Sequence, residues 1–346
     1  MVRSRAASFA APRIRLAYRW LRGVLAAGLL FGTVVAHAAE GTPAKPSADA
    51  SVVKLQLAAS AFAPETLHVT VYLPPGYASP RARRVRYPVL YANDGQDMPS
   101  VGLKQTLARL YRAHAIHPII VVAVDMLADR ASGYGLSDRA TARSLVGGSR
   151  IGPIGTRAHD YSAWLATTLV PYIDAHYRTV PKAPSRAMLG WSLGALNAFN
   201  LGWQYPAVFG TVGAFSPSFW LAADRSSADT VQRTRLAQTM VGSSRKRAHL
   251  RLWFAVGSAE ETDDRDGDGI NDAEDDVRDL VFGYRTAAGP QAPGLQQLGY
   301  PISTDPNAPP GTPVVLTVLQ GGEHNQASWK RMLPSFLRWA FGRGAR

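Results

Sequence analysis

A serine lies between two glycines in the segment Gly190–Gly194, which reads Gly-Trp-Ser-Leu-Gly. The apolar run Ala187–Gly190 predicts a strand before it, and the residues from Leu193 to about Trp203 predict a helix after it. In this setting the glycines allow a tight turn that lifts the serine hydroxyl above the sheet. With 31 glycines in the chain, the Gly-x-Ser-x-Gly pattern alone could arise by chance. The strand–turn–helix context is what favours a catalytic role for the serine. We therefore predict that Ser192 is a nucleophile.

A serine nucleophile needs a neighbouring imidazole to accept its proton. The usual chain order around such a turn is serine, acid, histidine, and only His249 and His324 follow Ser192. His249 precedes a predicted strand and would lie at the far end of the sheet. His324 follows the predicted strand Val314–Val318, so the sequence predicts His324 as the base.

The acid that orients this histidine should follow the predicted strand Leu250–Val256. Four carboxylates are candidates there: Glu260, Glu261, Asp263 and Asp264. Glu260 is nearest the strand end and is our first choice, with Glu261 and Asp263 as alternatives. An acidic loop can also be merely solvated, which leaves the choice open.

The same region fits a calcium-loop pattern. Residues 264–275 match D-x-D-x-D-G-x-x-D-x-x-D at every fixed position, and Gly269 permits the sharp turn that such a loop needs. Because the last position is Asp, the loop resembles thrombospondin type 3 and dockerin-type calcium loops more than an EF-hand. We expect a structural Ca²⁺, not needed for the chemistry, at Asp264, Asp266, Asp268, Ile270, Asp272 and Asp275. An exposed acidic loop without an ion is the alternative.

The elements that must position these residues alternate between strands and helices. Strands are expected at Leu67–Leu73, Tyr87–Tyr91, Pro118–Val124, Ala187–Gly190, Val212–Phe215, Leu250–Val256 and Val314–Val318. Helices are expected at Leu103–Ala113, Tyr161–Tyr177, Leu193–Trp203 and Ser328–Phe341. This order predicts an α/β fold, with a mostly parallel central sheet and helices on both faces, as one domain over residues 51–346. Such sheets bind ligands at the carboxyl ends of their strands, where the candidate residues lie.

Composition excludes several kinds of chemistry. The chain has 346 residues, a net charge of +13 and no cysteine. It therefore has no disulfide, no cysteine-ligated zinc or iron–sulfur cluster, and no cysteine nucleophile. The basic residues are scattered rather than interleaved with aromatic ones, so nucleic-acid binding is not indicated.

The N-terminal residues have the pattern of a targeting segment. Six arginines and no acidic residue occur in residues 1–22, an uncharged run follows at residues 23–36, and Ala36-His37-Ala38 supplies small residues for cleavage. We predict a signal peptide at residues 1–38 and a flexible lead-in at residues 39–50, hence a periplasmic or secreted protein without a membrane span after cleavage. An uncleaved N-terminal anchor is the alternative.

Several stretches carry a resemblance to a known family: Val71–Tyr77, Tyr87–Asp97, Val170–Arg178, the serine turn and Gly321–Trp329. Through them the sequence resembles the esterase branch of the α/β-hydrolases, which includes enterochelin (trilactone) esterases, feruloyl esterases, S-formylglutathione hydrolase and mycolyltransferases. The resemblance is spread over most of residues 66–340 and implies a serine esterase, acting through an acyl-enzyme on a small-molecule ester. Ala195 and Thr168 depart from the common pattern, which weakens any transfer of substrate identity.

Two groups of residues complete the predicted site. The backbone N–H of Leu193, at a helix start, could hold an oxyanion, and the resemblance implies Gln96 as the second donor. The long irregular stretch Ala128–Arg157 should border the site, so Arg130 and Tyr134 are expected to contact substrate. Trp191 and Trp220 could form part of the pocket wall.

Two rival functions remain: an acyltransferase with the same triad, and a non-catalytic exported binding protein. The sequence does not indicate the oligomeric state.

Overall fold

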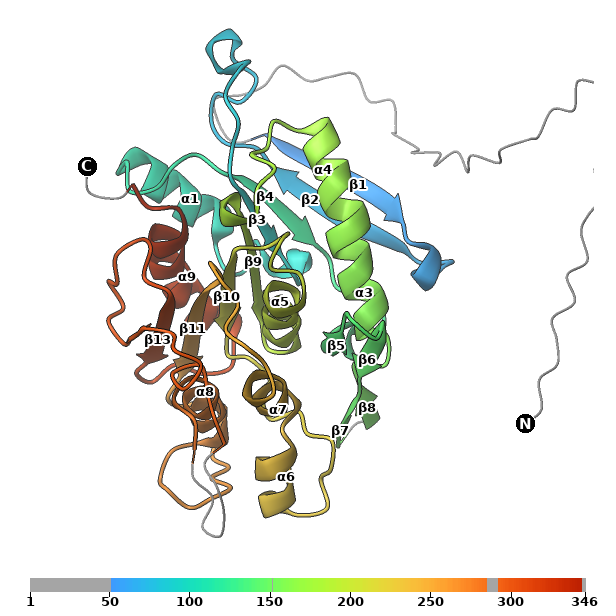
Figure 1. The fold of residues 1–346 in the computed structure, drawn as a ribbon. Coiled ribbons are helices and arrows are strands. Elements are labelled where there is room, and N and C mark those ends of the chain that lie inside the picture. Colours follow the sequence, from blue (N-terminus) through green and yellow to red (C-terminus); the bar gives the residue numbers. More distant parts are fainter. Residues whose placement is uncertain (1–50, 151, 285–291, 344–346) are drawn as a thin grey trace, which may run out of the picture. The chain divides into compact units, whose positions relative to one another are not determined.

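The computed structural model describes residues 51–150, 152–284 and 292–343 (Figure 1). The expected signal peptide and lead-in lie outside these residues. Within the described ranges, no helix combines the length and apolar character that crossing a bilayer requires.

A nine-stranded sheet runs through the described residues, and it confirms the predicted mostly parallel architecture. In spatial order its strands are β1 (Val52–Ala58), β2 (Thr66–Tyr72), β4 (Ile120–Val124), β3 (Val89–Ala92), β9 (Arg186–Trp191), β10 (Thr211–Phe215), β11 (Arg251–Gly257), β13 (Val314–Leu319) and β12 (Ile302–Ser303). The pairs β1–β2 and β2–β4 are antiparallel, and every other pair in this sheet is parallel.

Helices cover both faces of the sheet, which explains why the central strands are apolar throughout. On one face lie α1 (Leu103–Arg112) and α9 (Gln326–Phe341). On the other lie α3 (Ala158–Trp164), α4 (Val170–His176), α5 (Leu193–Gln204), α7 (Leu236–Gly242) and α8 (Asp272–Phe282). All five residues of β4 are buried, as expected for a parallel-type strand packed on both sides.

The parallel register brings five strand ends to one edge of the sheet. Trp191 pairs with Phe215, Phe215 with Ala255, and Gly257 with Leu319. The residues that follow β3, β9, β10, β11 and β13 therefore emerge side by side, where ligands of such sheets bind.

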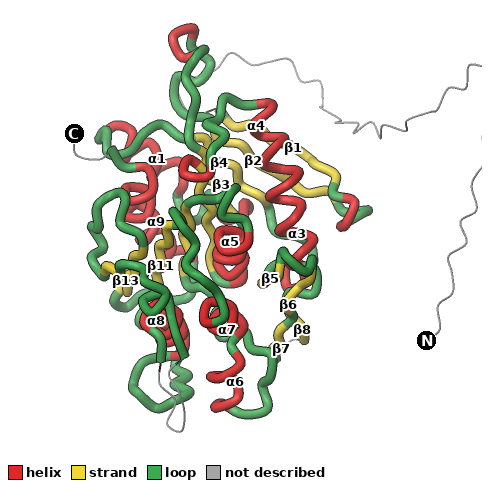
Figure 2. Tube along the Cα trace, viewed as in Figure 1, coloured by secondary structure: helices red, strands yellow, loops and turns green. Residues whose placement is uncertain are grey.

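Several features differ from the sequence-based expectation. Strands β1 and β12 and helices α6 (Ala228–Thr234), α7 and α8 were not predicted. The expected helix Tyr161–Tyr177 begins earlier, as α3, and passes through a π-helical turn at Leu165–Leu169 before α4. The stretch Ala128–Arg157 is not irregular, because it contains α2 (Arg130–Gly133) and two hairpins, β5–β6 and β7–β8 (Figure 2). Their strands are β5 (Leu136–Asp138), β6 (Arg143–Leu145), β7 (Gly147–Ser149) and β8 (Gly152–Ile154).

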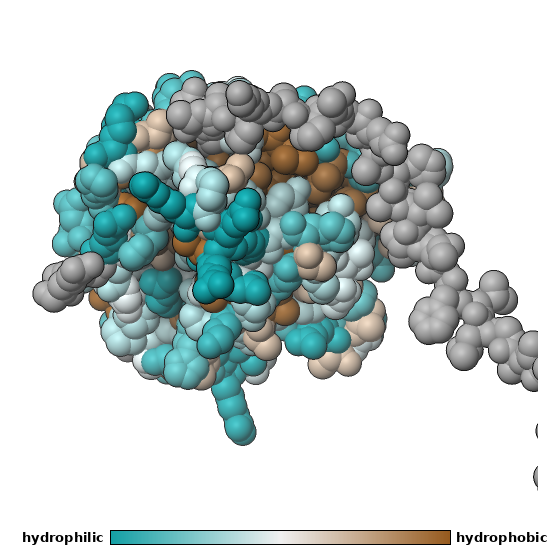
Figure 3. All heavy atoms as spheres, turned by 90° about the horizontal axis from the view of Figure 1, so that it is seen from above, coloured by the Kyte–Doolittle hydropathy of each residue, from teal (hydrophilic) through white to brown (hydrophobic). Residues whose placement is uncertain are grey.

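The face seen in Figure 3 is mostly hydrophilic, with hydrophobic residues gathered in one region of it. Across the described residues, the large hydrophobic side chains that stay exposed are Val52, Val85, Met126 and Val146.

Candidate active site

Ser192 occupies a strained turn between β9 and α5. Its backbone has φ 57° and ψ −129°, a conformation that a side chain rarely adopts and that is found at functional turns. A Cβ at Gly190 would lie 2.2 Å from the carbonyl oxygen of Gly194, and one at Gly194 would lie 2.4 Å from Oδ2 of Asp94. Both glycines are therefore needed for the chain to turn this closely.

His324 and Glu260 meet at the ends of β13 and β11. The Nδ1 of His324 lies 2.9 Å from Oε2 of Glu260, whose side chain is 1% exposed, while the imidazole is 40% exposed. The other carboxylate oxygen, Oε1, accepts hydrogen bonds from the Gly257 N–H and the Ser216 hydroxyl. The structure thus brings Glu260 to the histidine, and neither Glu261 nor Asp263 makes this contact.

The hydroxyl of Ser192 points to another serine in this structure. Its Oγ lies 3.5 Å from the Oγ of Ser218, which follows β10. Among the described residues, no hydrogen bond joins Ser192 to His324, although both line the same cavity. Nucleophile–base contacts are often loose without substrate and tighten in the complex, so the arrangement is compatible with a triad.

Two backbone N–H groups, after β9 and after β3, lack an intrahelical partner and are the candidates for holding an oxyanion. Leu193 is the first residue of α5, so its N–H has no carbonyl one turn earlier to bind. Gln96 lies in the short 3₁₀ turn Gly95–Asp97 after β3, where the first N–H groups also lack an intrahelical partner. Leu193 lines the cavity, whereas Gln96 does not.

The 3₁₀ turn is fixed against the serine turn by Asp94. Arg130 donates to both Asp94 oxygens, at 2.8 and 3.0 Å, and also to the Trp191 carbonyl at 3.3 Å. The hydroxyl of Tyr134 accepts from the Asp94 N–H at 3.1 Å. Burial raises the pKa of Asp94, and the hydrogen bonds and charge of Arg130 oppose that shift.

Arg130, Tyr134 and Trp191, which we expected to contact substrate, lie outside the lining of the cavity beside Ser192. Tyr134 is 0% exposed and Trp191 1%. Arg130 and Tyr134 are held by Asp94, and the Trp191 Nε1 donates to Asp97 at 3.0 Å. In this structure the three residues contact the turns on either side of Ser192. Trp220 does line the cavity, as expected.

A cavity of about 750 Å³ opens over Ser192, Glu260 and His324. One wall comes from the β7–β8 hairpin, with Arg150 and Ile154. A second comes from the loop after β10 and from α6 (Ala228–Thr234), and a third from the segment between β11 and α8. This volume is ample for a drug-sized organic ligand.

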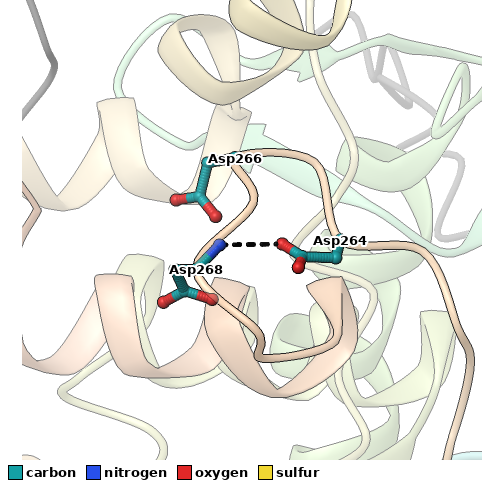
Figure 4. Close-up of side chains that lie close together, drawn as sticks. All are labelled: Asp264, Asp266 and Asp268. Carbon is teal, nitrogen blue, oxygen red and sulfur yellow. Dashed lines mark hydrogen bonds between the residues drawn. The ribbon is translucent and has the colours of Figure 1, made fainter.

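The acidic loop brings together three of its predicted ligands. Carboxylate oxygens of Asp264, Asp266 and Asp268 lie within 4.8 Å of one another, and all three residues are exposed (Figure 4). Asp264 accepts from the backbone N–H groups of Asp268 and Gly269, at 3.2 and 3.0 Å, which shapes the loop around its side chain.

The remaining predicted ligands lie in different surroundings. The Asp272 carboxylate pairs with Arg265 at 3.0 Å, so it does not join the cluster, and Ile270 donates its N–H to Asp268. Asp275 is 7% exposed, and none of the described residues donates a hydrogen bond or forms an ion pair to its carboxylate. Burial, together with the carboxylates of Asp279 and Asp266, raises the pKa of Asp275 to about 7.

Arg265 links this loop to the cavity wall. It contacts Asp272 and Asp276 and also donates to Gln232 of α6, at 2.8 and 3.0 Å. Asp276 also binds Arg235, which is 1% exposed, so the loop, α6 and α8 share one buried ion network.

Sequence reasoning did not single out Ser216, Ser218 or Trp329. Ser216 directly follows β10 and Ser218 comes two residues later, and this place after a strand end is the only signal that could have drawn attention to them. Trp329 lies on the first turns of α9, five residues after His324, where only the structure shows its contacts.

Comparisons with known proteins agree with this architecture. A sequence model of the family described as "Putative esterase" matches residues 60–280. The uncharacterized protein YbbA of Bacillus subtilis (strain 168) is 24% identical over 197 residues, covering 55% of this chain and 68% of YbbA. A second uncharacterized protein of that strain, YjcH, is 26% identical over 156 residues, covering 44% of this chain and 56% of YjcH.

Solved structures share the fold at low sequence identity. A ferulic acid esterase superposes with a TM-score of 0.57 at 17% identity, covering 85% of this chain and 99% of that one. The enterochelin esterase of Shigella flexneri gives a TM-score of 0.55 at 14% identity, covering 84% of this chain and 57% of that one.

Proposed function

Because the chain belongs to the Putative esterase family, we propose that it hydrolyses a carboxylic ester through a triad of Ser192, His324 and Glu260. The observation that carries the triad is the 2.9 Å contact between His324 and the buried Glu260, on a cavity that Ser192 also lines. A buried carboxylate on Nδ1 fixes the tautomer in which Nε2 is free to take a proton.

The reaction follows from these positions. The Ser192 hydroxyl rotates from Ser218 toward His324, loses its proton to Nε2 and attacks the ester carbonyl. The N–H groups of Leu193 and Gln96 hold the resulting oxyanion. His324 then gives the proton to the leaving alcohol, which leaves an acyl group on Ser192. Water, activated by the same imidazole, releases the acid and restores the serine.

Hydrolysis of short p-nitrophenyl esters by the full chain tests this function. Turnover that is lost in Ser192→Ala and kept in Ser218→Ala supports the proposal. A folded wild-type chain that is inert on every ester would contradict it. Adding an alcohol acceptor separates hydrolysis from acyl transfer, since a transferase would form the new ester in preference to free acid.

We also propose that the acidic loop holds a structural Ca²⁺. The convergent carboxylates of Asp264, Asp266 and Asp268 support this, since hard oxygen ligands suit calcium. The buried carboxylate of Asp275, which has no partner among the described residues, supports it further, because an unpaired buried anion is costly. Asp272 would contribute only if it left Arg265. The ion would stabilise the loop beside the cavity and take no part in the chemistry.

We propose, finally, that residues 1–38 direct the chain out of the cytoplasm and are cleaved, so that the enzyme acts in the periplasm or outside the cell. Intact-mass analysis of the protein isolated from the periplasm or medium tests this, since cleavage after Ala38 fixes the mass of the mature chain.

A further inference from the structure

We propose that Ser216, Trp329 and Trp191 form one positioning network that holds both halves of the catalytic machinery, the histidine–acid pair and the oxyanion turn. This inference rests on the triad proposed above. The three residues act in this proposal by positioning other groups, and none of them has to touch the substrate.

The network begins at the triad acid. The hydroxyl of Ser216 donates to Oε1 of Glu260 at 2.5 Å, while Oε2 faces His324. Because Oε1 also accepts the Gly257 N–H, the carboxylate is fixed on one side and can present only its other oxygen to the imidazole. Hydrogen bonds to an ionised carboxylate are among the stronger ones, so the loss of one should shift or loosen this group.

Ser216 is itself held by an indole. The Nε1 of Trp329 donates to the Ser216 hydroxyl oxygen at 2.9 Å, which leaves the serine proton free for Glu260. Ser216 is 2% exposed and has a φ of 47°, in the left-handed region. A residue other than glycine rarely keeps such a φ unless specific contacts hold it, and the Ser216 hydroxyl has two, to Glu260 and to Trp329.

The same indole touches the base and reaches the nucleophile strand. The ring of Trp329 meets that of His324 edge-on, with centroids 5.5 Å apart. Its other neighbour is Trp191, the residue before Ser192, on which it stacks at 5.4 Å with an interplanar angle of 12°.

Trp191 carries the network to the oxyanion turn. Its Nε1 donates to Asp97 at 3.0 Å, and Asp97 directly follows Gln96, whose N–H is the second oxyanion donor in the proposed mechanism. The stacked indoles therefore stand between the two sets of groups, with one N–H directed to each.

Double-mutant cycles on kcat test this assignment. We expect Ser216→Gly and Trp329→Phe each to lower kcat by about 10-fold with KM nearly unchanged, because each removes one hydrogen bond from the chain that ends on a charged group. Glycine suits the positive φ at position 216, so Ser216→Gly should stay folded, and its melting temperature should fall only by the loss of the two buried hydrogen bonds. In a Glu260→Ala background, the two substitutions should change kcat by less than about 2-fold, since the group they position is gone.

Trp191→Phe provides the contrasting case. It removes the N–H to Asp97 and keeps an aromatic ring in the stack, so its loss of kcat should persist in the Glu260→Ala background. Trp253→Phe is the matched control: Trp253 is also 1% exposed and packs on another tryptophan, but its indole N–H has no partner among the described residues. It should leave kcat unchanged.

The inference would be overturned if Ser216→Gly and Trp329→Phe lowered kcat as much in the Glu260→Ala background as in the wild-type background. It would also be overturned if both single variants kept the wild-type kcat. An error in the proposed triad would give a different result, because Ser192→Ala would then retain turnover.

Discussion

The Nδ1 of His324 and the Oε2 of Glu260 lie 2.9 Å apart although the two residues are 64 positions apart in the sequence. The contact joins the ends of β13 and β11, which are neighbours in the sheet. Among the four candidate carboxylates that follow β11, Glu260 is the one that makes this contact.

The first prediction concerns that selection. We expect Glu260→Gln to lower kcat by about 10³- to 10⁴-fold, because an amide cannot stabilise the imidazolium or fix the tautomer in the same way. Glu261→Gln, at the adjacent carboxylate, is the control and should keep kcat within about 3-fold. Steady-state hydrolysis of a p-nitrophenyl ester measures both. A larger loss of kcat in Glu261→Gln than in Glu260→Gln would show that Glu260 is not the acid of the triad.

Arg130 should act on stability and on kcat rather than on substrate affinity. Arg130→Gln leaves the buried Asp94 carboxylate without its counter-charge, which we expect to lower the free energy of unfolding by about 3 kcal/mol. KM should change little, because Arg130 does not line the cavity. A rise in KM with unchanged stability would restore the interpretation as a substrate contact.

The same variant should show a distinctive pH dependence. Burial raises the pKa of Asp94 above its usual value, so the folded chain binds this proton more tightly than the unfolded chain does. Stability from this group is therefore lost as pH rises through the folded pKa, and the loss is larger without Arg130. The gap in unfolding free energy between wild type and Arg130→Gln should be wider at about pH 7 than at about pH 3, below the ordinary pKa of an aspartate, as chemical denaturation would show. A gap that widens toward acid would contradict this.

Gly194 tests the geometry of the serine turn. A Cβ there would meet the Asp94 carboxylate at 2.4 Å and the Cβ of Asn93 at 3.3 Å, so Gly194→Ala must push the 3₁₀ turn away from Ser192. We expect a loss of about 1–3 kcal/mol in stability, typical of overpacking, and a fall in kcat from the displaced oxyanion donor. Gly148→Ala is a useful comparison, because a Cβ there would meet only the flexible side chain of Arg225, at 3.3 Å. Equal effects of the two substitutions on kcat would argue against the turn contact.

Calcium should raise the melting temperature without changing kcat. An ion at 100 times its Kd adds about 2.7 kcal/mol to the folded state, which corresponds to several degrees for a chain of this size. Asp266→Asn with Asp268→Asn should remove the shift, whereas Asp229→Asn, at an exposed carboxylate on α6, should keep it. Thermal melts in EDTA and in added Ca²⁺ measure this, and identical melts of the wild-type chain would count against the ion.

The sequence predicted those parts of the site that depend on strand ends. Ser192, Glu260 and His324 all follow strands whose apolar runs are visible in the chain, and parallel register brings such ends together. Glu260 could not be separated from its acidic neighbours, because its position depends on the chain turning back so that its carboxylate accepts the Gly257 N–H.

The residues expected to contact substrate lie outside the cavity lining for a different physical reason. Arg130 and Tyr134 do lie near the site, but their partner Asp94 is 36 and 40 residues away, and a sequence does not show which way a loop side chain points. Strand β1 was missed although its residues alternate, because an edge strand of this kind is only half-buried and carries a weak apolar signal.

The most direct test of the account is covalent labelling of the full chain with a fluorophosphonate, read by intact mass and peptide mapping. We predict one label per wild-type chain, on Ser192, with parallel loss of p-nitrophenyl ester turnover. Ser192→Ala should take no label, and Ser218→Ala should still be labelled. Labelling or turnover that survives in folded Ser192→Ala would show that the nucleophile lies elsewhere and would contradict the proposed triad.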